Sequence, residues 1–430
     1  MAIKILTTAD IHIGRTSSGA VQIGDNSSTR NAWVRITDYA IEEDIHVLVI
    51  AGDIVEHANR YFEAASALEA GLAKLDQAGI SVFLVSGNHD YDVLPALMER
   101  RQFENVHFLG QGGNWEFKTV EIAGQKIQFA GWSFPKMHYY NDPLYDFPES
   151  EVDKNAICIG LIHGDYENKE SSYAPLQLNT MTGKGIDIWI MGHIHKPEQF
   201  NTAPLIFYPG SPQALSAKEK VEHGAVLLTV SKQGTIQKEV VPFSSVRYEE
   251  IEIDISECSE QDEIRAKIID NCDSFIKNKI ERSDYLELLS FDVILTGTQV
   301  DISKLEEWIE NWDIHEFNRD IGGLHVSVRK VDHQCKAQVG DLETLSKEPT
   351  PAGILAKIIL DLEAGDSSEL LDLIKKDGWS SIKALNSHNT YLPLRDSDGI
   401  EQYDKDDLNN LIIQECHRLL SELMQTKAEG

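Results

Sequence analysis

The sequence lacks the two features that would place the protein in or beyond a membrane. No apolar run approaches the roughly 18 residues that a membrane-spanning helix needs. The opening segment, MAIKILTTAD, reads as a β-strand and has neither the apolar stretch nor the cleavage site of a signal peptide. We therefore expect a cytoplasmic protein without a membrane partner.

Cysteine is also scarce, and its spacing argues against a disulfide framework. The chain has five cysteines, an odd number, and no two of them form a CxxC pair. We therefore interpret the cysteines as reduced and mostly buried thiols, not as partners in disulfides.

Basic residues are few as well. The net charge is −31, and the residues after position 240 contain 40 acidic and 20 basic side chains. This balance argues against a protein that holds nucleic acid by bulk positive charge. Any contact with nucleic acid must be local, or must depend on metal ions or on a partner.

The sequence does contain enough apolar residues for a sizeable core. Its 430 residues predict two or three domains, and 42% of them are hydrophobic. Up to about residue 240, short β-branched strands alternate with helical stretches, which predicts an α/β fold with both sheet faces covered. We place one domain over residues 1–245, a small α/β domain over 246–332, and a linker with a helical region over 333–430.

Polar clusters follow the first three predicted strands. Asp10 and His12 come just after IKILTTA, Asp53 closes VLVIAGD, and Asn88 with His89 follows SVFLVSG. Residues two apart in an extended segment face the same way, and ligands of α/β folds gather at the carboxyl ends of strands. Each cluster is a weak signal by itself, because an ordinary surface turn explains it equally well.

Two further clusters complete the pattern. His163 ends ICIGLIH, and His193 with His195 follows DIWIMG. Carboxylate, amide and imidazole ligands suit Mn²⁺, Zn²⁺, Fe or Co, and a site without thiolates disfavours a structural zinc ion. Seven ligands are too many for one ion, but they fit two ions about 3.5–4 Å apart that share a carboxylate. We predict a two-metal centre built from Asp10, His12, Asp53, Asn88, His163, His193 and His195.

The order of these motifs resembles that of the calcineurin-like metallophosphoesterases over residues 1–215. Within them, GHIHKP at 192–197 followed by YPGSPQALS at 208–216 looks like the SbcD family of bacterial DNA repair exonucleases. The resemblance implies a four-layer sandwich of two sheets flanked by helices, with an α/β capping domain and a helical C-terminal region. It also implies a nuclease that cleaves DNA phosphodiesters with two metal ions, Mn²⁺ being the best candidate.

The resemblance also assigns roles to individual residues. Asp10, His12, Asp53 and His195 would hold the first ion, while Asp53, Asn88, His163 and His193 would hold the second. His89 would protonate the leaving oxygen. The position three residues after the bridging Asp is His in archaeal and eukaryotic relatives but Glu56 here, as in related phosphatases where an acid orients the catalytic His. His57 is the alternative orienting residue. Glu56 and His57 could also be ordinary exposed loop residues without a catalytic role.

Arginines near the early loops are candidate contacts for flanking DNA phosphates. Arg15 and Arg60 are the main candidates, with Arg30 and Arg35 beside them. Solvated surface arginines explain each of them equally well.

The C-terminal region carries an apolar stripe at helical spacing. The stripe comprises Leu408, Leu411, Ile412, Cys416, Leu419, Leu420 and Met424. Families of this kind work with an SMC-type ATPase, SbcC in bacteria, and form homodimers through helices that correspond to residues 55–105. The stripe therefore serves either to dock that ATPase or to pack on the chain's own core.

Two other functions compete with the DNA nuclease. A metallophosphoesterase acting on a smaller phosphodiester, such as a cyclic nucleotide, would use the same metal ligands. A non-catalytic scaffold on the same fold would have lost ligands or the catalytic histidine, whereas all are present here.

Overall fold

The computed structural model describes residues 2–56, 63–166, 168–280, 285–338, 341–386 and 405–429. The chain forms two compact units. The first comprises Met1–Tyr248 and Arg282–Leu289, and the second comprises Glu249–Glu281 and Ser290–Gly430. The domain boundaries near 245 and 332 stay predictions.

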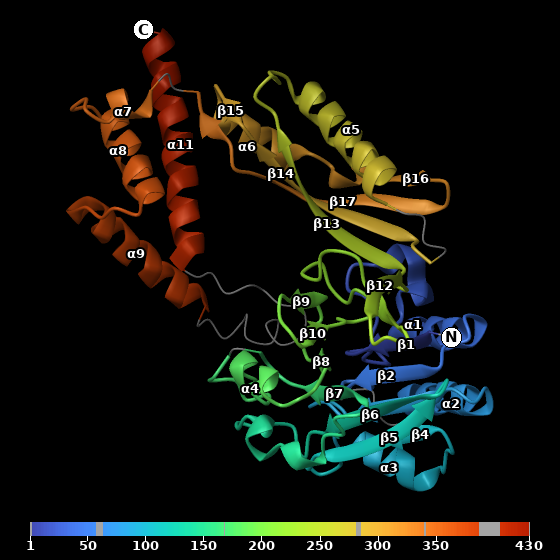
Figure 1. Ribbon diagram of the computed structural model, residues 1–430. Coiled ribbons are helices and arrows are strands. Elements are labelled where there is room, and N and C mark those ends of the chain that lie inside the picture. The colour runs from blue at the N-terminus through green and yellow to red at the C-terminus, as the bar shows by residue number, and fades with distance from the viewer. Residues whose placement is uncertain are drawn as a thin grey trace. The chain divides into compact units, whose positions relative to one another are not determined.

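The first unit contains two six-stranded sheets (Figure 1). The first sheet runs in the order β12 (Ile236–Pro242), β11 (Gly224–Val230), β1 (Ile3–Thr8), β2 (Val47–Ala51), β3 (Ser81–Val85) and β4 (Val106–Phe108). The second runs in the order β5 (Glu116–Ile122), β6 (Gln125–Trp132), β7 (Ile157–His163), β8 (Ile188–Gly192), β10 (Leu205–Tyr208) and β9 (Glu198–Phe200). The helices of this unit are α1 (Thr29–Glu42), α2 (Glu63–Gln77), α3 (Val93–Arg100) and α4 (Leu178–Thr182).

Successive side chains of the buried strands point to opposite faces of their sheet, and this creates separate apolar layers on the two faces. On β2, Leu48 packs with Trp33 of α1 and Leu72 of α2, whereas Val49 packs with Phe129 of the opposite sheet. A third apolar layer, which includes Trp189, covers the outer face of the second sheet. Three apolar layers separate four layers of secondary structure, so the predicted α/β sandwich of two sheets flanked by helices is confirmed.

The parallel register of the strands brings the polar clusters together. Strands β1, β2 and β3 run parallel, as do β6, β7 and β8. The carboxyl ends of parallel strands meet at one edge of a sheet, so the segments that follow them share one rim. The two sheets also approach each other here, because β2 contacts β7 and β8.

The second unit contains most of a small sheet, together with a helical part. The sheet runs in the order β13 (Val246–Asp254), β14 (Leu288–Thr296), β17 (Leu324–His333) and β16 (Arg319–Ile321), and Figure 1 shows α5 (Gln261–Lys279) along one of its faces. The remaining elements are β15 (Thr298–Gln299), α6 (Ile302–Asn311), β18 (Lys336–Ala337), α7 (Leu342–Leu345), α8 (Pro351–Ala364), α9 (Glu369–Asn386) and α11 (Lys405–Glu429).

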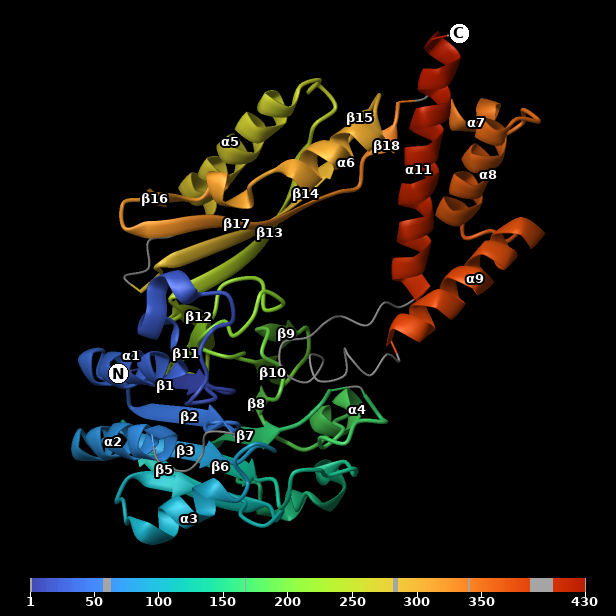
Figure 2. The same ribbon diagram turned by 180° about the vertical axis from the view of Figure 1, so that it is seen from behind.

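The C-terminal stripe lies mostly inside this second unit. Helix α11 runs beside α8 in both views (Figures 1 and 2). Cys416 and Leu420 of α11 are buried against Ile358 and Ile359 of α8 and Ile302 of α6. Among the described residues, no helix combines the length and the apolar character that a membrane span requires.

Candidate metal centre

The candidate ligands lie on tight turns that follow the strands. Asp10, His12, Asp53 and His193 all have positive φ values, between 48° and 105°, which non-glycine residues rarely adopt. Two backbone hydrogen bonds stabilise these turns: the Asp10 amide donates to the Gly52 carbonyl at 3.1 Å, and the His12 amide donates to the Asp53 carbonyl at 3.0 Å. Strained backbone held in this way is concentrated at functional sites.

The close approach of the turns depends on glycine. A Cβ atom on Gly192 would lie 1.9 Å from the Ala51 carbonyl oxygen, and one on Gly87 would lie 2.0 Å from an Asp53 carboxylate oxygen. Neither position can accept a side chain without displacing a candidate ligand or the strand beside it.

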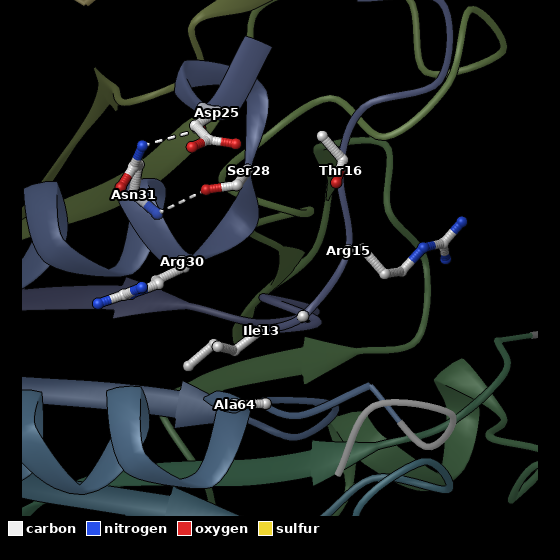
Figure 3. A pocket seen from close by; sticks show the side chains of 9 residues that line it. Ile13, Arg15, Thr16, Asp25, Ser28, Arg30, Asn31 and Ala64 are labelled. Carbon is white, nitrogen blue, oxygen red and sulfur yellow. Dashed lines mark hydrogen bonds between the residues drawn. The ribbon is translucent and has the colours of Figure 1, made fainter. Parts of the chain in front are cut away.

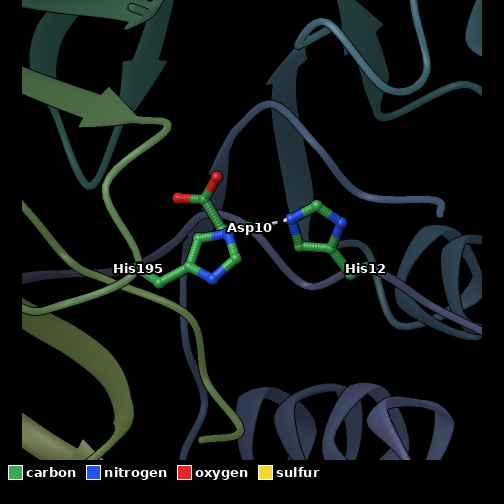
Figure 4. Close-up of side chains that lie close together, drawn as sticks. All are labelled: Asp10, His12 and His195. Carbon is green, nitrogen blue, oxygen red and sulfur yellow. Dashed lines mark hydrogen bonds between the residues drawn. The ribbon is translucent and has the colours of Figure 1, made fainter. Parts of the chain in front are cut away.

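Most of the candidate ligands converge on one buried space. His12 Nε2 lies 3.1 Å from His195 Nε2, and Figure 4 shows these rings beside the Asp10 carboxylate. His163 Nε2 lies 3.2 Å from Asn88 Oδ1 and 3.3 Å from Asp53 Oδ2. The Asp53 carboxylate is central, because its Oδ2 is also 3.9 Å from His12 Nε2.

His193 lies at the border of this space. Its ring centroid is 5.4 Å from that of His163, and its backbone amide donates to both carboxylate oxygens of Asp10, at 3.0 and 3.1 Å. Among the described residues, three compact groups could hold a metal ion: Asp10, His12 and His195; Asp10, Asp53 and His163; and His12, Glu56 and His89. His193 contributes a ligand atom to none of these groups.

The outer nitrogens of three histidines are anchored by acceptors. His12 Nδ1 donates to Glu56 at 3.1 Å, and His195 Nδ1 donates to Glu219 at 2.9 Å. His163 Nδ1 donates to the Ala51 carbonyl at 3.0 Å. Ligating histidines are held in this way, with one nitrogen protonated outward and the other presenting a lone pair inward.

This arrangement fits a cation. With Nδ1 protonated on both rings, His12 and His195 direct two Nε2 lone pairs at each other across 3.1 Å, which is repulsive unless a positive charge lies nearby. Metal–nitrogen bonds of about 2.0–2.1 Å place two ligands of one ion roughly 3 Å apart. The two nitrogens are therefore spaced as ligands of a single ion would be.

The charges of the metal-free site are strongly coupled. Burial would raise the pKa of Asp53, but the neighbouring His163 holds it well below its usual range. Burial would lower the pKa of His163, but Asp53 beside it raises that pKa to about 9. Burial raises the pKa of Asp10. A buried anionic carboxylate thus needs a positive charge beside it, which a metal ion supplies once the histidine is deprotonated.

His89 and Glu56 form a second group at the edge of the site. Glu56 accepts a hydrogen bond from His89 Nδ1 at 3.2 Å, which is the contact that the family resemblance implies. The His89 side chain is 34% exposed, and its Nε2 is 4.0 Å from Asp53 Oδ2. The same Glu56 also accepts from His12, so one carboxylate orients both a candidate ligand and the candidate acid. His57 lies outside the described residues.

Two orienting carboxylates were not found from the sequence. Glu219 accepts from His195 Nδ1, from Ser211 Oγ at 3.2 Å and from the Leu215 amide at 2.8 Å. It follows the PGSP segment closely, but no spacing rule links it to His195.

The second carboxylate is Asp90, the last residue of the segment GNHD at 87–90, which follows β3. It is fully buried and accepts from the amides of Ile54 at 2.6 Å and Gly87 at 2.8 Å. Asp90 therefore fixes the turn after β2 to the turn after β3. No role was predicted for Asp90 from the sequence.

The arginines predicted to contact DNA differ in their surroundings. Arg15 and Arg30 line a cavity of about 300 Å³ near the start of α1 (Figure 3), and Arg15 Nε lies 3.8 Å from Glu56. Arg35 donates to the Phe243 carbonyl at 2.9 Å and lies over the Tyr285 ring, so its contacts are structural. Arg60 lies outside the described residues.

Carboxylate, amide and imidazole groups thus gather at the strand ends of two sheets that lie between helices, an arrangement that can hold divalent metal ions. The family model of the calcineurin-like phosphoesterases matches residues 3–197. This part of the chain is therefore similar to the calcineurin-like phosphoesterases, a superfamily of hydrolases that use divalent metal ions.

Two relatives are similar to a larger part of the chain. "Uncharacterized metallophosphoesterase YhaO" of Bacillus subtilis (strain 168) is 26% identical over 268 residues, 59% of this chain and 64% of the relative. "DNA double-strand break repair protein Mre11" of Methanopyrus kandleri is 26% identical over 274 residues, 59% of this chain and 57% of the relative. The chain thus covers less than two thirds of either relative. The crystal structure of a dimetal phosphatase from Danio rerio is 13% identical, covers 54% of this chain and 93% of its own, and has a TM-score of 0.37.

Proposed function

We propose that the protein is a two-metal DNA nuclease of the SbcD type. The observation that carries the proposal is the convergence of His12 and His163 Nε2 on the Asp53 carboxylate, with His195 Nε2 beside that of His12 and His89 at the edge. In this proposal Asp10, His12, Asp53 and His195 hold one ion, and Asp53, Asn88, His163 and His193 hold the other. Mn²⁺ suits this mixture of oxygen and imidazole ligands.

The residues of the chain divide the chemistry between them. When bound, two divalent ions lower the pKa of a water molecule and neutralise charge on the phosphoryl oxygens. Asp53 and the three anchored histidines supply a fixed and buried ligand set. His89 lies at the partly exposed edge, where it can donate a proton from Nε2 to the leaving oxygen. Glu56 holds Nδ1 of that ring and so fixes which nitrogen faces the substrate.

DNA is the substrate that the observations favour. A relative at 26% identity is named as a DNA double-strand break repair protein, and the PGSP segment follows the last ligand as in SbcD-like nucleases. A smaller phosphodiester is the second candidate, because the net charge of −31 disfavours a strong intrinsic hold on DNA.

A comparison of two substrates tests the proposal. With Mn²⁺, we expect the wild-type protein to hydrolyse labelled duplex and single-stranded DNA as well as bis-p-nitrophenyl phosphate. Asp53→Ala should lose bound metal, measured by elemental analysis, together with both activities. Turnover of the small ester without any DNA cleavage would favour the second candidate, and undiminished metal in Asp53→Ala would refute the ligand set.

We further propose that an SMC-type ATPase, SbcC-like, supplies the hold on DNA that this acidic chain lacks. Exposed apolar side chains remain on the helices of the second unit: Leu370 and Leu373 of α9 are 46% and 57% exposed, and Leu411 of α11 is 45% exposed. A homodimer through α2 and α3, within residues 55–105, belongs to the same proposal, and light scattering of the purified protein tests it.

Point substitutions of exposed residues test the docking of the ATPase better than a deletion of α11, because α11 contributes to the core of the second unit. We expect Leu370→Lys with Leu373→Lys to abolish co-purification of the ATPase and ATP-stimulated DNA cleavage, with unchanged hydrolysis of bis-p-nitrophenyl phosphate. Val240→Lys, at a residue 39% exposed on β12 of the first unit, is the matched control. Normal ATPase binding by the double variant would rule out this surface.

A further inference from the structure

A line of aromatic rings leads from the metal centre to an exposed side chain. The ring centroid of Tyr173 lies 5.0 Å from that of His193, and His138 follows at 5.5 Å from Tyr173. Tyr140 comes next, at 6.3 Å from His138, and it is 65% exposed. The interplanar angles along the line are 37°, 48° and 36°, so successive rings are tilted but never edge to face. We name His138, Tyr140 and Tyr173 the ring ladder.

The backbone holds the ladder in place. Residues 138–140 pair with the segment around Tyr173: the Tyr139 amide donates to the Ser172 carbonyl at 2.8 Å, and the Ala174 amide donates to the Tyr139 carbonyl at 2.7 Å. Neighbouring side chains of an extended segment point to opposite sides. Tyr139 accordingly packs on buried Trp132, at 4.9 Å between centroids, and this contact fixes the segment that presents His138 and Tyr140.

Core packing explains only the inner part of the ladder. Tyr173 and His138 are partly buried and contact other rings on the way to the metal centre. Tyr140 leaves most of its surface in water and therefore adds little to the stability of the fold. Its position at the end of a continuous series of rings, beginning at a candidate metal ligand, points instead to a ligand that reaches the metal centre.

The chemistry of the ladder suits a nucleobase. Each nucleobase has a flat face that stacks on an aromatic ring, and one such contact contributes about 5-fold to 150-fold in affinity. Stacking does not rely on positive charge, which is what a chain with a net charge of −31 requires. Paired bases inside a duplex cannot offer their faces to a side chain, so a strand that stacks here must be unpaired near the scissile bond.

We propose that the ring ladder binds an unpaired nucleobase of the strand whose phosphodiester lies at the metal centre, with Tyr140 as the outer stacking surface. This inference rests on the proposed nuclease function and specifies its substrate as single-stranded or frayed DNA. It commits to DNA as the occupant, and a protein partner on the same surface is an outcome of the test.

Tyr140→Ala provides the test, with Tyr145→Ala as the matched control because Tyr145 is also an exposed tyrosine, at 77%, but has no place in the ladder. For single-stranded oligonucleotides, Tyr140→Ala should raise KM about 5-fold to 150-fold, and Tyr140→Trp should restore it. Metal content and turnover of bis-p-nitrophenyl phosphate should stay at wild-type values. Tyr145→Ala should behave as wild type throughout.

Abasic substitutions in the oligonucleotide locate the contact. Moving one abasic site along the strand should raise KM for the wild-type protein at one position, and at that position Tyr140→Ala should lose nothing more. An additive loss, or a wild-type KM in Tyr140→Ala, would overturn the inference. Loss of metal or of bis-p-nitrophenyl phosphate turnover in Tyr140→Ala would show a structural role and overturn it too.

Binding separates this inference from the proposed function. A phosphorothioate-linked oligonucleotide that resists cleavage should bind Tyr140→Ala more weakly than wild type by fluorescence anisotropy, whether or not the wild type cleaves DNA. If the wild type cleaves only bis-p-nitrophenyl phosphate, the proposed nuclease function fails. The anisotropy measurement then still shows whether the ring ladder binds a nucleobase. If Tyr140→Ala changes only stimulation by the ATPase, the surface is a protein contact and the inference fails.

Discussion

Replacement of Glu56 by Gln should damage either metal binding or proton transfer, because its carboxylate serves two rings and glutamine can serve only one of them. His12 Nδ1 and His89 Nδ1 both donate to it, at 3.1 and 3.2 Å. The two rings bond different oxygens, Oε2 for His12 and Oε1 for His89. A glutamine in the same orientation therefore accepts from one ring and presents its donor NH2 group to the other. A hydrogen bond to a charged group contributes about 1.5–3 kcal/mol, which corresponds to about 10-fold to 150-fold in an equilibrium.

The two consequences are measured separately. If the His12 bond is lost, Mn²⁺ affinity by isothermal titration calorimetry should fall about 10-fold to 100-fold, as for other partners of metal ligands. If the His89 bond is lost, metal affinity should hold while DNA cleavage falls more than turnover of bis-p-nitrophenyl phosphate, whose leaving group needs no proton. Glu42→Gln, at an exposed position on α1, is the control. Wild-type metal affinity together with a wild-type ratio of the two activities would refute the orienting role of Glu56.

Three further predictions concern single side chains. His89→Ala should keep its metal and lose most DNA cleavage but less turnover of the activated ester, and equal losses on both substrates would exclude the acid role. Glu219→Gln should weaken Mn²⁺ binding about 10-fold to 100-fold by calorimetry, because it weakens the bond that orients His195, and unchanged affinity would dismiss that role. Burial lowers the pKa of His417 to about 4, below its unfolded value of about 6.5. The unfolded chain therefore binds more protons between these values, so this contribution to stability is complete above about pH 6.5 and is lost as the pH falls toward 4. Urea unfolding should show that the free energy of unfolding of the wild type falls by about 1–2 kcal/mol over this pH range, after allowance for solvent screening. His417→Asn keeps an acceptor for the Ala337 amide and should reduce this dependence on pH.

The candidate ligands could be predicted because they depend on short-range sequence. Each follows an apolar strand, and parallel strands of one sheet end at a shared edge. Asp10 and Asp53 therefore had to lie near one another in the first sheet, and His163 near His193 in the second, once the fold class was known. The Glu56–His89 contact was expected from family resemblance. That Glu56 also contacts His12 depends on how the turn after β2 folds back toward the turn after β1, and no spacing in the sequence encodes this.

Residues that hold the ligands were harder to find. Glu219 reaches His195 from a loop 24 positions further along, and its other partners, Ser211 and the Leu215 amide, are also loop groups. Loops have no periodicity from which a contact can be inferred. Asp90 was visible within GNHD, but its role depends on the amides of Ile54 and Gly87, which meet only when β2 and β3 pair. The ring ladder joins segments that are likewise far apart in the sequence, at Tyr140 and Tyr173.

The C-terminal stripe shows why apolar periodicity alone does not identify a docking surface. A helical repeat specifies which residues share a face, and it says nothing of what covers that face. On α11, Cys416 and Leu420 are buried against the chain's own helices, whereas Leu411 and Leu423 are 45% and 37% exposed. Deletion of α11 would thus expose the core of the second unit, and loss of a partner could not be distinguished from unfolding. Substitutions at Leu370 and Leu373, which are exposed on α9 and outside that core, separate the two effects, because they can remove a docking contact while leaving the α8–α11 packing intact.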